Sequence, residues 1–304
     1  MKRRLRRLVG SASRLAVQLA GRAFVRGSRV SDALAVCGQL AARGRTATIG
    51  YFNAQGESPR AVADASLAAL QALDGGPSSR ATYLSIKAPA LRYDTALVGE
   101  IVDRARELRV GVHFDSHAVA DADATFDVIA ASHGRAQGAV DPTRWTLGGT
   151  LPGRWRRSLD DAERAIDLGL RVRVVKGQWI DPSAPDLDPR VGFMALIDRL
   201  AGRAREVAVA SHDAPLAREA VRRLQHAGTP VELELLRGLP SRAALKIARE
   251  LGVAVRVYVP FGVSWVPYAL DHVQNHPYVA LWAIRDATID RFVTPPLLGQ
   301  MRAD

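Results

Sequence analysis

The sequence contains a single cysteine in 304 residues, which excludes an internal disulfide and any metal site built from several cysteines. We expect Cys37 to be a small buried hydrophobic residue rather than a reactive thiol, in a reducing compartment. No apolar run approaches 18 residues, so we expect no helix that crosses a membrane. The apolar stretch of a secretory signal is also missing, because charges interrupt the apolar positions near the start.

Acidic residues are absent from the first 30 residues, which contain nine lysines or arginines. The remaining chain has 33 basic and 31 acidic residues, and a body so nearly neutral argues against a nucleic-acid-binding fold. Residues 1–24 have the apolar spacing of a helix with a basic end. This helix either packs on the domain or touches anionic lipid. We therefore expect a cytoplasmic protein, which in the second case is peripheral at the inner face of a membrane.

No glycine-rich phosphate loop follows the first predicted strand, where the sequence reads TIGYFNAQGES. A doubly wound sheet usually has such a loop, which makes that fold the weaker alternative. The chain instead repeats a strand followed by a helix eight times, and we interpret the strands as nearly continuous apolar runs. The predicted strands are 46–52, 81–87, 110–115, 145–151, 171–176, 206–212, 230–236 and 253–260. This pattern predicts an α/β fold, a (βα)8 barrel over residues 46–290, with a helical segment at 1–45 and a tail at 291–304.

Active sites of such barrels lie at the carboxyl ends of the strands. Polar side chains gather at those ends: Asn53, Lys87, Asp115, Lys176, His212, Asp213, Arg237 and Tyr258. A barrel with a purely structural role has no reason to collect ionisable groups on one rim, although some cap helices, as we expect for Asp213. In RVRVVKGQW, residues 171–179, the cations Arg173 and Lys176 suit an anionic ligand such as a phosphate or a reduced flavin. The alternative is that they form structural salt bridges.

No strong metal signature is present. The stretch HFDSH places His113, Asp115 and His117 on and just after one strand, which is a weak match to a metal site, and we expect no bound metal. The sequence also lacks a nucleophile elbow and any candidate nucleophile beside a base.

RVRVVKGQW and YVPFGVSWVPYALDH together resemble the fifth-strand and eighth-region motifs of the proline dehydrogenase family, which are flavoproteins built on a (βα)8 barrel. Further stretches resemble that family in the same order: YLSIKAPAL, VHFDSHAVADAD, LPGRWRRSLDD, VAVASHD and VELELLRGLP. The resemblance covers roughly residues 20–285. It implies an FAD-dependent oxidoreductase that acts on a CH–NH group by hydride transfer to flavin N5. A quinone is one candidate electron acceptor, and no nucleic acid is involved.

The resemblance also assigns roles to individual residues. The FAD would be bound by Arg173, Lys176, Gly177, Gln178, Trp179, Ser211 and His212. The substrate pocket would contain Lys87, Asp115, Tyr258 and Tyr268, and the positions that contact the substrate acid group are occupied by Asp271 and His272.

The chain departs from the family where a pair of arginines would bind the carboxylate of proline, because Asp271 and His272 stand there. An aspartate repels a carboxylate in a pocket of low dielectric, and bidentate guanidinium binding is not easily replaced. Pro152 and Glu234 each replace a glutamine of the family. We therefore expect oxidation of a proline-like amine or imino acid rather than proline itself. The alternatives are a true proline dehydrogenase with an altered carboxylate clamp and a non-catalytic flavin-binding or scaffold barrel.

Overall fold

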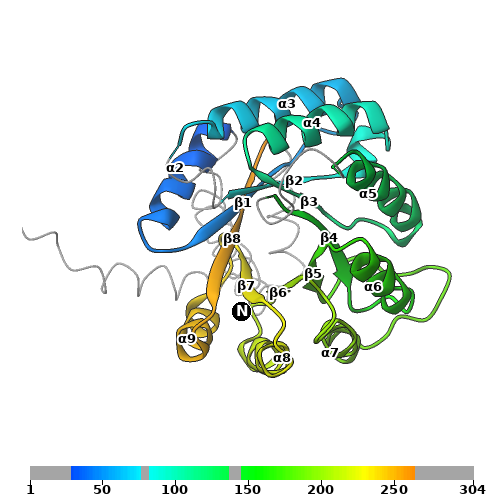
Figure 1. The fold of residues 1–304 in the computed structure, drawn as a ribbon, viewed down its shortest axis with the longest axis vertical. Coiled ribbons are helices and arrows are strands. Elements are labelled where there is room, and N and C mark those ends of the chain that lie inside the picture. Colours follow the sequence, from blue (N-terminus) through cyan, green and yellow to red (C-terminus); the bar gives the residue numbers. More distant parts are fainter. Residues whose placement is uncertain (1–28, 77–81, 137–144, 264–304) are drawn as a thin grey trace, which may run out of the picture.

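Eight parallel strands close into a barrel in the computed structural model, which describes residues 29–76, 82–136 and 145–263 (Figure 1). Each strand pairs with the next along the chain, and the last pairs with the first. The strands are β1 (Thr46–Tyr51), β2 (Thr82–Ile86), β3 (Gly111–Phe114), β4 (Leu147–Pro152), β5 (Arg171–Val175), β6 (Glu206–Ala210), β7 (Val231–Leu236) and β8 (Ala254–Phe261). The predicted (βα)8 barrel is thus confirmed, and the doubly wound alternative is wrong.

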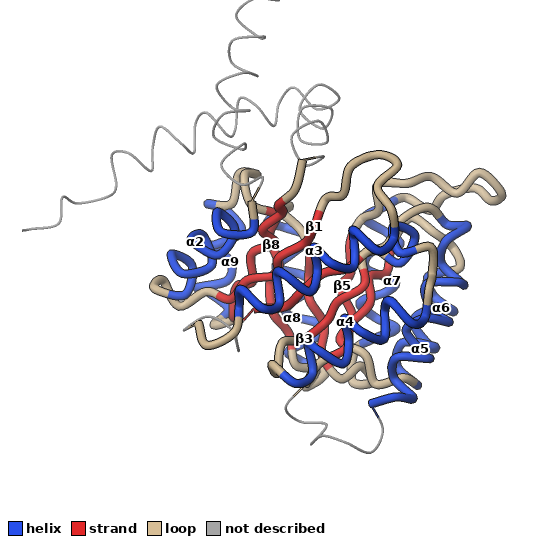
Figure 2. The backbone as a smooth tube through the Cα atoms, turned by 90° about the horizontal axis from the view of Figure 1, so that it is seen from above, coloured by secondary structure: helices blue, strands red, loops and turns tan. Residues whose placement is uncertain are grey.

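Helices cover the outside of the strands (Figure 2). They are α2 (Val30–Ala41), α3 (Pro59–Leu73), α4 (Thr95–Glu107), α5 (Ala122–Ala136), α6 (Ser158–Asp167), α7 (Pro189–Leu200), α8 (Ala214–His226) and α9 (Arg242–Leu251), with short 3-10 turns η2 (Ala88–Leu91) and η3 (Val119–Asp121). Their apolar faces bury aliphatic side chains against the outward residues of the strands. This outer layer between helices and strands is the hydrophobic core.

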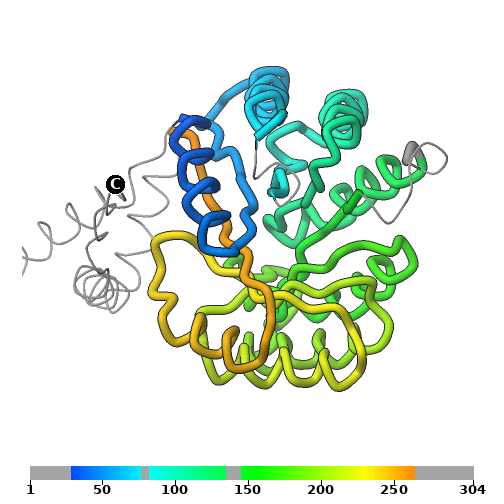
Figure 3. The backbone as a smooth tube through the Cα atoms, turned by 60° about the vertical axis from the view of Figure 1, so that its left-hand side comes forward, coloured from blue at the N-terminus to red at the C-terminus, as the bar shows by residue number. Residues whose placement is uncertain are grey.

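Helix α2 precedes the first strand and packs against β1 and β8, where the barrel closes (Figure 3). Cys37 is buried in this contact, as predicted, and burial raises the pKa of its thiol to about 11. A thiol this far from ionisation is a poor nucleophile at neutral pH.

None of the helices in the described ranges is both long and apolar enough to cross a membrane. The basic segment 1–24 and the tail 291–304 lie outside those ranges.

Several strands alternate between apolar residues that face the helices and polar residues that face the barrel axis. On β5, Val172 and Val174 join the outer core, whereas Arg171 and Arg173 bond to side chains of other strands across the interior. Barrels of this type are usually filled by branched aliphatic side chains. This barrel is instead filled largely by paired charges, so the expectation of nearly continuous apolar strands is wrong for its interior face.

Candidate active site

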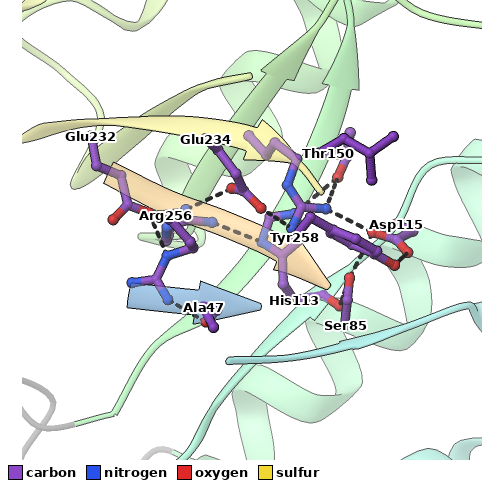
Figure 4. Close-up of polar contacts among 12 residues, drawn as sticks. Ala47, Ser85, His113, Asp115, Thr150, Glu232, Glu234, Arg256 and Tyr258 are labelled. Carbon is purple, nitrogen blue, oxygen red and sulfur yellow. Dashed lines mark hydrogen bonds and ion pairs between the residues drawn. The ribbon is translucent and has the colours of Figure 1, made fainter. Parts of the chain in front are cut away.

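Asp115 is the centre of a buried polar cluster at the carboxyl end of the barrel (Figure 4). Its carboxylate accepts hydrogen bonds from Ser85 Oγ at 2.6 Å, Arg173 Nη1 at 2.7 Å and the Tyr258 hydroxyl at 2.7 Å. These donors come from β2, β5 and β8, so they meet across the barrel rather than along one strand pair. The fold therefore brings together three residues predicted for the site, Asp115, Arg173 and Tyr258.

Lys87 completes the cluster on the side of β1. Its Nζ donates to the Tyr51 carbonyl oxygen at 2.6 Å, lies 3.8 Å from Asp115 Oδ2 and sits 3.9 Å from the ring centroid of Phe52. Burial lowers the pKa of Lys87, and the negative charge of Asp115 only partly offsets this effect. The ammonium group is thus held in a desolvated position where a further anion would be favourable.

Two opposing effects act on the Asp115 carboxyl. Burial by itself raises its pKa, but the positive charges of Arg173 and Lys87 outweigh burial and lower the pKa below its usual value. Asp115 is therefore ionised at neutral pH. Burial, followed by the charge of Asp115, raises the pKa of Tyr258 well above its ordinary range, so the phenol remains a hydrogen-bond donor.

The position of the Tyr258 ring depends on a glycine in the neighbouring strand. A Cβ added at Gly50 on β1 would overlap the Tyr258 hydroxyl, so only glycine leaves room for the ring to lie across this strand. The ring also lies 5.2 Å from the Arg173 guanidinium and meets Phe52 edge-on at 6.5 Å.

Arg173 has one nitrogen without a partner. Its Nη2 donates to Glu234 Oε1 at 2.7 Å and its Nη1 to Asp115, but the buried Nε finds no acceptor in the part of the chain that the structure describes. An unsatisfied buried N–H costs about 1–3 kcal/mol. A ligand acceptor would remove this cost.

Lys176 lies away from the Asp115 cluster, at the rim. Its Nζ forms an ion pair of 2.9 Å with Asp213 Oδ2, and its side chain is 39% exposed. Asp213 caps α8 through the amide of Leu216, as predicted, and also contacts Arg190. The sequence was compatible with either a ligand-binding or a salt-bridge role for Arg173 and Lys176. Both form salt bridges, to different partners.

The remaining predicted cofactor residues shape the loops around Lys176. Ser211 Oγ accepts from the amide of Asp213 at 3.2 Å. His212 Nε2 accepts from the amide of Leu236 at 3.0 Å, so Nδ1 carries the proton and donates to the Pro240 carbonyl at 2.8 Å. His212 is therefore a neutral imidazole that fastens the loop after β7 to the end of β6.

The loop after β5 is fastened by the segment that follows β4. Arg154 donates to the carbonyls of Gly177 and Gln178, at 3.4 and 2.8 Å, and the Trp155 indole donates to the Trp179 carbonyl at 2.8 Å. Gly177 has a φ of 95°, and a Cβ there would lie 2.9 Å from Arg154 and Pro152, so glycine is required. Trp179 is 48% exposed on this fixed loop.

A deeper network, not predicted from the sequence, lies below the Asp115 cluster. Arg171 is fully buried and donates to Glu206 Oε1 at 3.1 Å, to Glu234 Oε2 at 2.9 Å and to Glu232. Arg256 donates from Nε to Glu232 Oε1 at 2.6 Å and from Nη1 to the Ala47 carbonyl at 2.7 Å (Figure 4). One sequence feature could have indicated this network. Charged residues stand two apart on β5 and on β7, which puts them on one face of each strand.

His113 is part of the same interior. Its Nε2 lies 2.9 Å from Thr150 Oγ1 and its Nδ1 lies 3.3 Å from Arg171 Nη1, while burial lowers its pKa well below the usual value. Within residues 29–76, 82–136 and 145–263, no group of three histidine, cysteine or carboxylate side chains could hold a metal ion. The predictions for Tyr268, Asp271 and His272 concern residues outside the described ranges.

No family model matches the sequence. Curated proteins and solved structures that are similar to it were found. Proline dehydrogenase 1 of Bacillus subtilis (strain 168) is 23% identical over 284 residues, which are 88% of this chain and 90% of that protein. Two solved structures of proline utilization A (PutA) share the fold. The protein from Bdellovibrio bacteriovorus, inactivated by N-propargylglycine, has a TM-score of 0.72 at 15% identity over 93% of this chain, and that from Corynebacterium freiburgense has 0.66 at 16% over 94%. The chain spans about a third of the length of these two chains, 36% and 34%.

Proposed function

Because the chain is a divergent member of the proline dehydrogenase family, we propose that it is an FAD-dependent oxidoreductase that acts on the CH–NH group of proline. The observation that carries this proposal is the buried cluster of Lys87, Asp115, Arg173 and Tyr258 at the carboxyl end of a closed barrel, where such folds place their chemistry. The expectation that proline itself is not the substrate finds no support. It rested chiefly on Asp271 and His272, which lie outside the described residues, and to a lesser degree on Pro152 and Glu234; the B. subtilis relative is a proline dehydrogenase.

The residues at the carboxyl end of the barrel, here called the mouth, include Arg173 and Lys176, and they fit a flavin. The buried Nε of Arg173 lacks an acceptor in the described chain, and Gly177 keeps the backbone free of a side chain beside Lys176. Arg173 and Lys176 would hold the electron-rich edge of the ring system, and the bound FAD would supply a hydride acceptor at N5. The other residues proposed to hold the cofactor are Gly177, Gln178, Trp179, Ser211 and His212.

The side chains of the cluster would then bind and orient an amino acid. Lys87 would offer a desolvated positive charge to the substrate carboxylate. Its Nζ lies 3.8 Å from Asp115 Oδ2, with which it forms an ion pair. Asp115 fixes Arg173 and Tyr258 through one hydrogen bond each, which sets the shape of the pocket before the substrate binds. Tyr268, Asp271 and His272 stay predictions for the same pocket.

Anaerobic titration of the purified protein with L-proline, followed at the absorption bands of a bound flavin, tests the proposal. Bleaching of the flavin absorption by L-proline supports it. Bleaching by pyrrolidine or by a proline ester, but not by proline, would restore the expectation of a substrate without a free acid group. A bound flavin that none of these amines reduces would favour the non-catalytic barrel, and protein without flavin would overturn the proposal.

Lys176→Met is expected to weaken FAD binding roughly tenfold, about 1.4 kcal/mol, because it removes a cation next to Gly177. Arg190→Met is the matched control, since Arg190 contacts the same Asp213 from α7. Isothermal titration of each apoprotein with FAD gives the two affinities. Equal losses in both variants would mean that Lys176 acts only through Asp213.

A quinone acceptor and lipid contact through residues 1–24 are further proposals, supported by the nine basic and no acidic residues among the first 30. Sedimentation with anionic liposomes should retain the full chain and lose most of a chain that lacks residues 1–20. If both chains sediment with the liposomes to the same extent, the proposed lipid contact is contradicted.

A further inference from the structure

Glu234 is shared between two buried arginines of β5. Its Oε1 accepts from Arg173 Nη2 at 2.7 Å, and its Oε2 accepts from Arg171 Nη2 at 2.9 Å. The side chain of Glu234 is 3% exposed, and neither arginine is more than 6% exposed. Each carboxylate oxygen thus has its own guanidinium donor, and the two hydrogen bonds together fix the orientation of the Glu234 carboxylate.

The same contacts determine how Arg173 meets a ligand. Asp115 holds Nη1 and Glu234 holds Nη2, both at 2.7 Å, which leaves the buried Nε as the nitrogen without an acceptor in the described chain. A guanidinium group is planar, so two anchored nitrogens fix the direction of the third. Glu234 therefore takes part in aiming the Nε–H of Arg173.

Glu234 also changes the charge at the mouth. Lys87, Arg173 and Asp115 together carry one net positive charge, and the carboxylate of Glu234, which also pairs with Arg171, partly cancels it. Burial raises the pKa of Glu234, but the charges of Arg173 and Arg171 outweigh this effect and lower the pKa to about 2. The cancelling charge is therefore present throughout the neutral range. In a buried region its field is screened much less than in water.

We infer that Glu234 is a positioning residue that limits the positive charge Arg173 presents to a bound flavin and so lowers the reduction potential of that flavin. This inference rests on the proposed function, because it takes the flavin to lie against Arg173. A reduced flavin is an anion, so a mouth with less positive charge stabilises it less.

The test is the midpoint potential of FAD in the holoprotein, measured by equilibration with a reference dye. Glu234→Gln keeps the size and one acceptor oxygen but removes the charge. At a fixed potential we expect the ratio of reduced to oxidised flavin to rise about tenfold, a positive shift of about 30 mV for a two-electron couple. Because Glu234 stays ionised, the shift should be constant from about pH 6 to 8.

Glu232→Gln is the matched control. It removes the same charge from the same strand, two residues deeper, where Glu232 bonds Arg171 and Arg256 rather than Arg173. We expect its flavin ratio to change less than about twofold, since the charge lies farther from the mouth. Glu234→Asp keeps the charge but draws it back from Arg173, so its potential should lie between those of the wild type and Glu234→Gln.

The possible outcomes separate the inference from the proposed function. A wild-type chain that binds no FAD would overturn both. Bound FAD with an unchanged potential in Glu234→Gln, or an equal shift in Glu232→Gln, would overturn the inference alone. If Glu234→Gln does not fold, Glu234→Asp decides: a potential equal to that of the wild type would overturn the inference.

Discussion

Arg171→Met is expected to lower the free energy of unfolding by about 3–5 kcal/mol, because it leaves buried carboxylates without their shared cation. Arg171 has no exposed surface and lies between Glu206, Glu232 and Glu234, of which the last two are themselves buried. Arg256 still neutralises Glu232, and Arg173 still neutralises one side of Glu234, but the network then has one negative charge too many. A loss of this size is a large part of the stability of an ordinary domain.

Urea unfolding followed by circular dichroism measures this loss. Arg199→Met is the matched control, because Arg199 bonds Glu163 at the surface, where both partners are partly exposed and the pair is worth less than about 1 kcal/mol. Removing charge from the partners as well, in Arg171→Met with Glu232→Gln, should recover part of the stability. Equal midpoints for Arg171→Met and Arg199→Met would show that the interior charges do not hold the barrel together.

The barrel itself was predictable because its signal is local. Each strand run and each helix run can be recognised within a short window, and eight repeats of the pair leave few architectures. The predicted strand 171–176 and the observed β5 (Arg171–Val175) differ by one residue. Such boundaries follow from side-chain patterns that neighbouring residues share.

The contents of the barrel were not predictable in the same way. Arg171 and Arg173 are two apart, as are Glu232 and Glu234, so the sequence places each pair on one face of a strand. Which face points inward, and which arginine meets which glutamate, depends on the register of strands that are not neighbours. Long-range register leaves no trace in a short window, so this network was found only in the structure.

The candidate site shows the same division. Lys87, Asp115, Arg173 and Tyr258 were predicted from strand ends and from a family resemblance, and closure of the barrel brings them together. Lys176 was predicted beside Arg173, but the chain turns at Gly177 and its ammonium group pairs with Asp213 instead. Residues three apart in a strand lie on opposite faces, so the spacing already separates these two cations. The partner of each comes from another strand or helix, and this could not be read from the sequence.

Asp115→Asn is expected to lower the rate of flavin reduction by L-proline about 10²–10³-fold, which corresponds to about 2.7–4 kcal/mol. The carboxylate is the common acceptor for Ser85, Arg173 and Tyr258, and it forms an ion pair with Lys87. An amide supplies one acceptor oxygen and turns an NH₂ group towards two buried cations. Arg173 and Lys87 would then repel each other without the intervening charge, and Tyr258 would lose its anchor.

Single-turnover reduction in a stopped-flow instrument measures the rate, and the FAD content and melting temperature show whether the variant remains folded and loaded. Asp186→Asn is the matched control: Asp186 also bonds an arginine, Arg154, but in the loop after β5 rather than in the barrel interior. Its rate should change less than about threefold. If Asp115→Asn binds FAD and reduces it at the wild-type rate, the Asp115 cluster takes no part in the reaction. Tyr258→Phe should then also be silent, whereas an intact role for Asp115 predicts a smaller loss for Tyr258→Phe than for Asp115→Asn, because Phe leaves the carboxylate with its two cations.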